Sequence, residues 1–452
     1  MSAEAPSCLG PPPARFPHRV LIVAALLLLA PAALAQATPA AAETVPATPS
    51  ATLPATLEVC PSGCQYTSVT TAVAAANEGD TVLVRAGHYL EPTIHITKPL
   101  TLEGVDWPIL DAGGEGGVVL VSADHVTVRG FVLQNSGFSH IEDVAALRVG
   151  EFGGCTIENN RVLNSFFGIY LEKSVACTVK GNEVRSEGVL EAYTGNAIHA
   201  WSAYHPHIVD NYVTGHRDGI YLEFVRNGVV EDNVSEQNLR YGLHYMFTND
   251  TRFERNTFRN NGAGTAVMYS RNIDMFGNFF EDNWGAAAYG LLLKDLSDSQ
   301  ILGNTFAGNS AALYVDGANR TDVERNDFIN NGYALRILSN SMGVLVTHNN
   351  FIGNTFDVVT NSDRSYNSFL ENYWDAYEGY DLDRDGVGDV PYRPVRLFAM
   401  TVQWYPQAMV LLRSPLSQAM EYAERLLPVI TPKAIEDDRP LMGRIRWSSL
   451  SD

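Results

Sequence analysis

Basic residues and cysteines are scarce in this sequence of 452 residues. Lysine and arginine number 31 against 51 aspartates and glutamates, the formal net charge is −20, and there are five cysteines. A negative charge of this size argues against nucleic acid or an anionic membrane surface as a partner. The sequence also lacks a nucleophile elbow, a zinc motif and a phosphate-binding loop, so none of the corresponding enzyme classes is indicated.

A long apolar run occurs only near the N-terminus, where residues 1–35 have the pattern of a secretory signal peptide. Basic residues at 15–19 precede the apolar stretch 20–33, which leads into an Ala-Leu-Ala cleavage motif. The stretch is short for a membrane span and contains Pro31, so we expect cleavage and export rather than an anchor. Residues 36–56 are rich in alanine, threonine and proline and predict a flexible linker.

An asparagine recurs between apolar positions, in the pattern apolar-x-x-Asn-x-apolar, at intervals of mostly 22 or 23 residues. A period this regular is the signature of a repeat architecture, and it is too short for paired helices. The first column consists of Asn160, Asn182, Asn211, Asn233, Asn256, Asn278, Asn304, Asn326, Asn349 and Asn372, although Ser235 takes the apolar position after Asn233. A second column consists of Asn164, Asn238, Asn261, Asn283, Asn309, Asn331 and Asn354.

Each repeat has the pattern strand, bend, strand, bend, strand, which predicts an all-β protein, a right-handed parallel β-helix with asparagine ladders. Asparagine suits the bends because it tolerates the left-handed backbone conformation, and rungs stack at ~4.8 Å. Residues Thr67–Ala76 predict a short helix that caps the N-terminal end, so the solenoid with its cap covers 57–400. Residues 404–430 have helical apolar spacing, and we expect 401–452 to form a helical docking arm and tail.

Four cysteines follow the predicted signal peptide, an even number that suggests pairing in an oxidising compartment. Cys60 and Cys64 are four residues apart and could close a small local loop. Cys155 and Cys177 each lie five residues before a ladder asparagine, so they should occupy one column on adjacent rungs. Their Cα atoms would then be ~5 Å apart, as in a disulfide. The alternative is two stacked thiols in the core.

Histidines and methionines gather on the strand that follows the second bend. Alternation from the inward apolar positions points His199 and His244 outward, and counting from Val267 puts Met268 in the same column. Met246 lies two residues beyond His244 on the same face. Imidazole and thioether ligands together favour Cu(I) over hard cations. The sequence therefore predicts a transient copper site formed by His244, Met246 and Met268, with His199 close by.

The alternative interpretation of this face is a metal-free patch for docking another protein. Trp201, Tyr221 and Glu223 would form that docking surface. A third interpretation is enzymatic, because parallel β-helices often act on polysaccharides with paired acids and bases. Asp218, Glu223 and Arg217 are the candidates for that chemistry, although the outward positions show no clear run of acid and base along a sugar-length groove.

An acidic loop near the C-terminal end resembles the first nine positions of a calcium-binding loop. Glycine takes its sixth place, but the twelfth place is Tyr392 instead of glutamate, and no helices flank the loop. The loop is interpreted either as a calcium site that staples the end of the solenoid or as an acidic capping turn. The candidate ligands are Asp381, Asp383, Asp385, Val387 and Asp389.

Several long runs resemble the NosD family, periplasmic maturation proteins of nitrous oxide reductase. They are GHRDGIYLEF at 215–224, RYGLHYMF at 240–247, AVMYS at 266–270, YGLLLKDLSDS at 289–299 and NYWDAYEGYDLDRDGVGDVPYRPV at 372–395. The resemblance implies a parallel β-helix and a periplasmic, non-enzymatic protein that handles copper for the copper centres of nitrous oxide reductase. It also implies the partners, namely the permease and ATPase of an ABC transporter and a membrane-anchored copper chaperone as donor. It supplies no ligand set, so the copper residues rest on column geometry.

Overall fold

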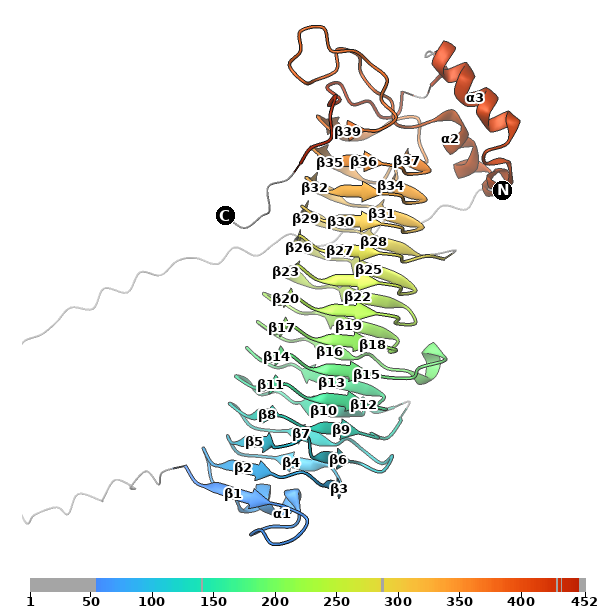
Figure 1. Ribbon diagram of the computed structural model, residues 1–452. Coiled ribbons are helices and arrows are strands. Elements are labelled where there is room, and N and C mark those ends of the chain that lie inside the picture. Colours follow the sequence, from blue (N-terminus) through green and yellow to red (C-terminus); the bar gives the residue numbers. More distant parts are fainter. Residues whose placement is uncertain (1–53, 140, 286–287, 428–429, 432, 447–452) are drawn as a thin grey trace, which may run out of the picture. The chain divides into compact units, whose positions relative to one another are not determined.

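The computed structural model describes residues 54–446 except 140, 286–287, 428–429 and 432 (Figure 1). The predicted signal peptide and nearly all of the predicted linker lie outside the described residues. Within the described part, no helix is both long and apolar enough to cross a membrane.

Three parallel sheets run along the solenoid, and each strand pairs with the strand one repeat further on. Sheet A contains 14 strands, sheet B contains 13 and sheet C contains 12. The partners in each sheet are one repeat apart in sequence, so a residue lies beside its counterpart of the next repeat. The parallel β-helix predicted from the asparagine repeat is therefore confirmed.

The strand bounds follow the repeat in each sheet. Sheet A consists of β1 (Thr56–Val59), β2 (Thr81–Val84), β5 (Thr101–Gly104), β8 (Thr127–Arg129), β11 (Thr156–Glu158), β14 (Thr178–Lys180), β17 (His207–Val209), β20 (Val229–Glu231), β23 (Asn249–Glu254), β26 (Arg271–Phe276), β29 (Ser297–Leu302), β32 (Asn319–Glu324), β35 (Met342–Thr347) and β38 (Tyr366–Leu370). Sheet B consists of β3 (His88–Leu90), β6 (Ile109–Asp111), β9 (Val132–Gln134), β12 (Arg161–Leu163), β15 (Glu183–Arg185), β18 (Tyr212–Thr214), β21 (Val234–Glu236), β24 (Thr257–Arg259), β27 (Phe279–Glu281), β30 (Thr305–Ala307), β33 (Asp327–Ile329), β36 (Asn350–Ile352) and β39 (Tyr373–Trp374). Sheet C consists of β4 (Ile94–Ile96), β7 (Val119–Val121), β10 (Ala145–Val149), β13 (Phe167–Glu172), β16 (Ile198–Trp201), β19 (Asp218–Glu223), β22 (Tyr241–Met246), β25 (Ala263–Met268), β28 (Tyr289–Lys294), β31 (Ala311–Asp316), β34 (Tyr333–Ile337) and β37 (Phe356–Val359).

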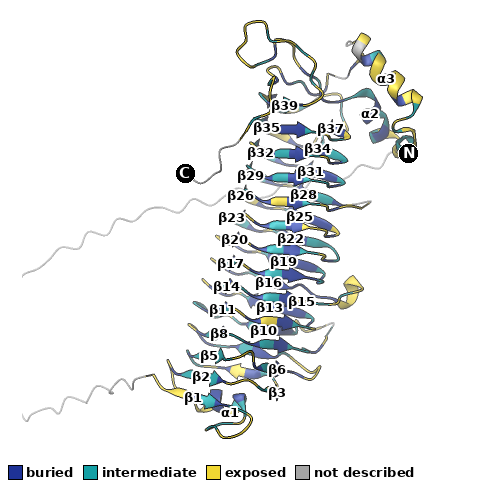
Figure 2. Cartoon of the chain, viewed as in Figure 1, coloured by how far each residue is buried: buried dark blue, intermediate teal, exposed yellow. Residues whose placement is uncertain are grey.

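The core consists of buried apolar side chains inside the three sheets. Figure 2 colours the buried residues along the strands dark blue. Because each repeat places the same kind of residue at the same point, aromatic rings lie one above another. Five phenylalanines and one tryptophan of sheet B form such a stack, with ring centroids 4.1–5.5 Å apart. The stack consists of Phe258, Phe280, Phe306, Phe328, Phe351 and Trp374. Burial of these rings is a main source of stability.

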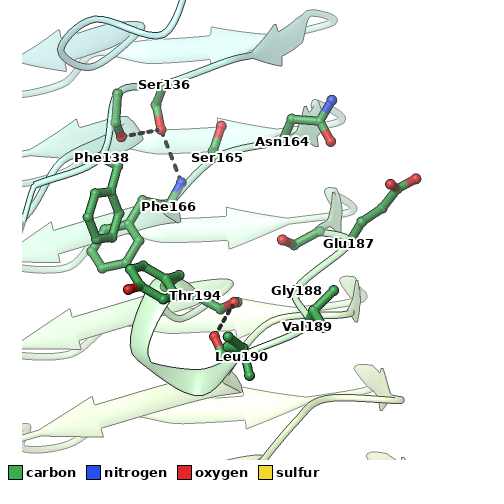
Figure 3. A pocket seen from close by; sticks show the side chains of 13 residues that line it. Ser136, Phe138, Asn164, Ser165, Phe166, Glu187, Gly188, Val189, Leu190 and Thr194 are labelled. Carbon is green, nitrogen blue, oxygen red and sulfur yellow. Dashed lines mark hydrogen bonds between the residues drawn. The ribbon is translucent and has the colours of Figure 1, made fainter.

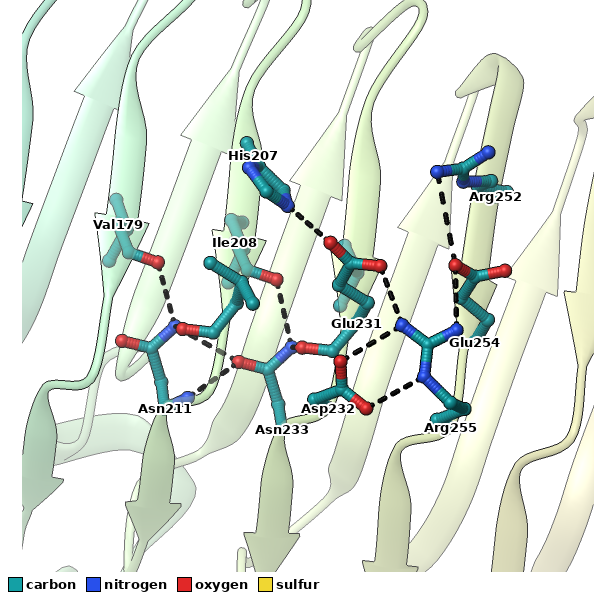
Figure 4. Close-up of polar contacts among 12 residues, drawn as sticks. Val179, His207, Ile208, Asn211, Glu231, Asp232, Asn233, Arg252, Glu254 and Arg255 are labelled. Atoms are coloured by element: carbon teal, nitrogen blue, oxygen red, sulfur yellow. Dashed lines mark hydrogen bonds and ion pairs between the residues drawn. The ribbon is translucent and has the colours of Figure 1, made fainter. Parts of the chain in front are cut away.

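The first asparagine column forms a continuous ladder of buried amides (Figure 4). Asn211 Nδ2 donates to the carbonyl of Val179 and to Oδ1 of Asn233, each over 2.9 Å. The backbone N–H of Asn211 also donates to Asn233 Oδ1. The expectation that these asparagines adopt the left-handed conformation is wrong, because the residue before each one does so, as at Asp210 and Asp232 with φ of 57° and 56°. This turn places the asparagine amide inward, where it satisfies buried backbone groups.

The second column is a similar ladder that begins later than predicted. The backbone N–H of His216 donates to Asn238 Oδ1 over 3.1 Å, and the ladder continues from Asn238 to Asn354. Asn164, predicted as its first member, is instead an exposed residue with a φ of 49°. The next residue, Ser165, takes the buried position. The spacing of four residues from Asn160 to Asn164, instead of five, explains the difference.

Helices cover both ends of the solenoid. The predicted N-terminal cap is present as α1 (Val69–Ala75), where the Ser68 side chain accepts a hydrogen bond from the backbone N–H of Thr71. At the other end lie α2 (Leu397–Trp404), the 3-10 helix η2 (Pro406–Leu411) and α3 (Pro415–Leu426). The first of these helices begins before the predicted residue 404, and it packs on β37 through Phe398 and Val402. A 3-10 helix, η1 (Glu191–Tyr193), lies in the longest repeat.

The irregular segment after α3 returns to the last rung and completes the first ladder. Asn372 donates to Asp437 Oδ2 through its backbone N–H and its side-chain amide, over 3.1 and 3.0 Å. Trp374 Nε1 donates to the same carboxylate over 3.0 Å. Asp437 therefore takes the place of the next asparagine and leaves no open ladder end.

Both cysteine pairs are joined in the structure. Cys60 is bonded to Cys64 near the N-terminal cap, with Cα atoms 5.5 Å apart. Cys155 is bonded to Cys177 on the next rung, with Cα atoms 4.6 Å apart. The second disulfide links successive repeats in the N-terminal half of the solenoid.

Candidate functional site on the outer face of sheet C

The outer face of sheet C carries a column of rings that belong to successive rungs. Strand pairing places Tyr170 beside His199, His199 beside Tyr221 and Tyr221 beside His244. The ring centroids are 4.6–4.8 Å apart and the planes are 20–28° from parallel. The sequence predicted His199 and His244 on one outward column, and the register agrees for these two residues.

The predicted position of Met268 in this column is wrong. The residue beside His244 on the next rung is Ala266, and Met268 lies beside Met246 instead. The connection from the second ladder to the strand is one residue shorter here, so Thr265, and not Val267, occupies the inward position opposite Leu243. The prediction assumed an apolar residue at the inward position, and Thr265 is polar. The predicted alignment was therefore two residues off along the strand, so it placed Met268 on the correct face of the sheet but in the wrong column.

The two histidines are also more deeply buried than an exposed face would imply. His199 is 7% exposed and His244 is 6% exposed, because the neighbouring rings of the stack cover them. The ring of Tyr221 lies between the two imidazoles. His199 therefore cannot ligate the same ion as His244.

His244 is oriented by a buried ion pair. Its Nδ1 lies 3.4 Å from Oδ2 of Asp218, and Arg240 binds the same carboxylate with two nitrogens. Burial opposes the charge of Asp218, but the hydrogen bonds from His244 and Arg240 outweigh it and lower the pKa of the carboxyl to about 2. The other nitrogen, Nε2 of His244, is buried and has no hydrogen-bond partner among the described residues. Such an imidazole, held by a carboxylate at one nitrogen, resembles a metal-ligating histidine.

Two methionines lie on the same face, one column further along the strands. Met246 and Met268 are paired on adjacent rungs, and both are partly buried. The hydroxyl of Tyr221 donates to Met246 Sδ over 3.6 Å. Thioether and imidazole groups are the donor types that Cu(I) prefers over hard cations.

A cleft of about 550 Å³ adjoins the ring column on its N-terminal side. Trp201, Tyr221 and Glu223, the predicted docking residues, all line it, although Tyr221 is only 9% exposed. His199 also lines it, and neither of its ring nitrogens has a hydrogen-bond partner among the described residues. Burial, with a smaller contribution from the charge of Arg217, lowers the pKa of His199 to about 3, so the imidazole is neutral at physiological pH.

A second pocket, of about 400 Å³, is drawn in Figure 3 and shares the lining residue Phe166 with the cleft. It is formed where the loops after β9 and β12 meet the insertion that contains η1. Val189, Leu190 and Tyr193 of the insertion are 83%, 58% and 62% exposed. The insertion corresponds to the 29-residue interval between Asn182 and Asn211.

The sequence did not indicate an exposed aromatic ladder at the end of the methionine strands. Phe224, Phe247 and Tyr269 stack with centroids 5.1 and 5.2 Å apart, and all are more than a third exposed. Each has a positive φ, between 52° and 55°, which is uncommon for a bulky residue. Their only signal in the sequence is that each follows the last residue of a sheet C strand.

The predicted calcium loop forms a compact acidic turn. Carboxylate oxygens of Asp381, Asp383 and Asp385 lie within 4.8 Å of one another, the only such group of histidines, cysteines or acids in the described chain. Backbone N–H groups of the loop donate to Asp381, including that of Gly386 over 2.9 Å. Tyr392 is 7% exposed and packs on Trp374, which explains why a core aromatic stands at the twelfth place.

Comparisons with known proteins agree with this architecture. The model of a family described as "Periplasmic copper-binding protein (NosD)" matches residues 183–379. A relative from Pseudomonas aeruginosa is 31% identical over 376 residues, which cover 79% of this chain and 87% of that protein. This chain belongs to the NosD family. A second member, from Stutzerimonas stutzeri, is 28% identical over 79% of this chain and 85% of its own length. Both NosD relatives carry the name "Probable ABC transporter binding protein NosD".

Among solved structures, the A-module of mannuronan C-5 epimerase AlgE6 from Azotobacter vinelandii has a TM-score of 0.50. It is 16% identical and covers 68% of this chain and 90% of the module. At this identity the likeness shows the shared fold and nothing about activity.

Proposed function

We propose that this NosD protein is a periplasmic accessory protein that receives copper and delivers it, with an ABC transporter, for maturation of the copper centres of nitrous oxide reductase. The family description and the names of the two relatives support the copper and transporter parts of the proposal. The resemblance noted in the sequence supports nitrous oxide reductase as recipient and a membrane-anchored copper chaperone as donor. A net charge of −20 is compatible with a cationic cargo and with basic partner surfaces.

The observation that carries the proposal is the donor set of His244, Met246 and Met268. Met246 and Met268 lie beside each other on neighbouring strands. His244, whose Nε2 has no hydrogen-bond partner among the described residues, lies on the same strand as Met246. A site that must release its metal should be incomplete and accessible, and thioethers bind Cu(I) without the negative charge of thiolates. Partial exposure of both methionines meets that requirement.

Competition binding of Cu(I) tests the proposal. We expect Met246→Leu/Met268→Leu to weaken Cu(I) binding by about tenfold or more, because leucine keeps the shape and removes the soft donor. The control is Met342→Leu/Met442→Leu, since these methionines are 54% and 41% exposed and lie elsewhere. Activation of nitrous oxide reductase, measured by its copper content, should fall only with the first pair. Unchanged binding and a fully loaded reductase in the first variant would refute this site.

The burial and the ionised state of Asp218, the strongest candidate for a catalytic acid or base, agree with a non-enzymatic role. Asp218 is fully buried and fixed by Arg240, and its pKa of about 2 keeps it ionised. A general base should have a pKa near the working pH and contact the substrate. We therefore assign Asp218 the role of orienting His244 instead of a catalytic one. No turnover on uronate polymers is expected from the purified protein.

A further inference from the structure

The cleft beside the ring column has an excess of negative charge. Four carboxylates line it, and the only lysine or arginine among its lining residues is Arg217. The four carboxylates belong to Glu142, Asp143, Glu172 and Glu223. Glu172 is paired with Arg148, but Glu142 and Glu223 have no ion-pair partner among the described residues. Unpaired carboxylates in a concave site focus a negative potential that attracts cations.

One of the residues that line the cleft is a histidine whose ring makes no hydrogen bond to the described residues. His199 is more than nine-tenths buried, and both ring nitrogens lack a partner among the described residues. A buried polar side chain without a partner is costly and calls for a ligand or water. Because the imidazole is neutral, it presents one lone pair that can accept a hydrogen bond from a cationic donor.

Aromatic walls complete the cleft. Trp201, Tyr170 and Tyr221 line it, and Lys173 already lies over the Trp201 ring at 5.7 Å, which shows that a cation can approach this ring. Burial, followed by the neighbouring carboxylates, raises the pKa of Tyr170 and of Tyr221. Aromatic faces next to carboxylates are a combination that binds ammonium and guanidinium groups.

We propose that this cleft binds a lysine or arginine side chain on an exposed segment of a partner protein. The carboxylates Glu142 and Glu223 would pair with the cation, His199 would accept one of its hydrogen bonds, and Trp201 would cover its apolar stem. A copper site is disfavoured because the lining contains neither methionine nor cysteine. A uronate polymer is disfavoured by the carboxylates. The inference rests on the proposed function only in requiring a protein partner.

Fluorescence anisotropy with labelled peptides tests the proposal on the full mature chain. The probe is Gly-Ser-Lys-Arg-Lys-Ser-Gly, with a neutral counterpart that carries norleucine and citrulline in place of the cationic residues. At about 150 mM salt, surface charges are screened beyond roughly 8 Å, so binding reports local contacts. We expect the basic peptide to bind and Glu142→Gln/Glu223→Gln to weaken it by about tenfold.

Two further variants make the test specific. Asp322→Asn/Asp363→Asn removes the same charge from exposed positions elsewhere, and binding should stay within about twofold. His199→Phe keeps the ring stack but removes both nitrogens, and binding should fall by about threefold or more. If both double variants lost the same amount of peptide affinity, the attraction would come from the overall charge and the proposal would be overturned. The same holds if the neutral peptide bound as tightly as the basic peptide. Binding of cello-oligosaccharides in place of the basic peptide would overturn it in favour of a sugar site.

Copper binding separates this inference from the proposed function. The single variant Glu142→Gln should weaken peptide binding but bind Cu(I) as the unmodified chain does, because Glu142 lies between β9 and β10, outside the strands that carry the methionine pair. If copper binds normally and the peptide does not bind, the cleft assignment fails and the copper function stands. If the peptide binds and copper does not, the docking cleft stands and the copper function fails.

Discussion

At the scale of single residues, burial of histidine makes this protein sensitive to acid. Burial lowers the pKa of His199 to about 3 and that of His216 to about 4, from an ordinary value of 6.5. Both rings are therefore neutral in the folded protein, while the unfolded chain binds protons below pH 6.5. Their contribution to stability is complete above that pH and is lost as the pH falls toward 4 and then 3.

We predict that the free energy of unfolding falls with a slope of up to ~1.4 kcal/mol per pH unit for each of these histidines below pH 6. Urea unfolding between pH 7 and pH 4.5 measures this slope. His199→Phe should reduce it, whereas His95→Phe at an exposed position should leave it unchanged. A slope that is identical in all three proteins would contradict the assignment of His199.

At the scale of the elements, each ladder asparagine satisfies several buried groups at once. Asn256 donates to the carbonyls of Val230 and Glu254 and to Asn278, and it accepts from Asn233. We predict that Asn256→Ala lowers the free energy of unfolding by about 2–4 kcal/mol, because buried partners are left unsatisfied. Asn260→Gly, at an exposed position with a φ of 53°, should change it by less than about 1 kcal/mol. Chemical denaturation gives both values, and similar losses would contradict the ladder's role.

The elements also show how far a repeat can be followed from sequence. The first asparagine column predicted the fold because a buried ladder tolerates almost no other side chain, so its spacing is visible without any other information. The column of Met268 could not be predicted, since Thr265 is a polar residue at an inward position and the bend before it is one residue shorter. The burial of His199 and His244 could not be predicted either. It depends on neighbouring rings and on Asp218, which are far apart in sequence.

At the scale of the whole molecule, a solenoid is held by contacts between neighbouring repeats, so its ends control how readily it frays. The acidic turn lies near the C-terminal end, where the backbone N–H of Gly388 donates to the carbonyl of Pro440 over 2.7 Å. We predict that calcium raises the melting temperature of chelator-treated protein and that Asp383→Asn/Asp385→Asn abolishes the increase. Binding to the folded state alone would add about 2.7 kcal/mol at a hundredfold excess over Kd. Absence of any shift would identify a metal-free capping turn.

We expect Asp437 to contribute more than the acidic turn to the stability of the C-terminal end of the solenoid. Its carboxylate is fully buried and accepts hydrogen bonds from backbone N–H groups of Glu371, Asn372 and Arg439, as well as from the side chains of Asn372 and Trp374. No neutral side chain of this size offers as many acceptor sites. We predict that Asp437→Ala lowers the free energy of unfolding by about 2–4 kcal/mol.

Asp437→Asn should recover part of that loss, because one amide oxygen can still accept from Asn372 while the amide nitrogen meets donors. Asp438→Ala, at the exposed neighbouring position, is the control and should be nearly neutral. Hydrogen exchange locates the effect, since fraying from the last rung should expose the amides of β38 and β39 before those of β22. If Asp437→Ala instead loosened all rungs equally, the end of the ladder would not limit opening, and the solenoid would unfold as one cooperative unit.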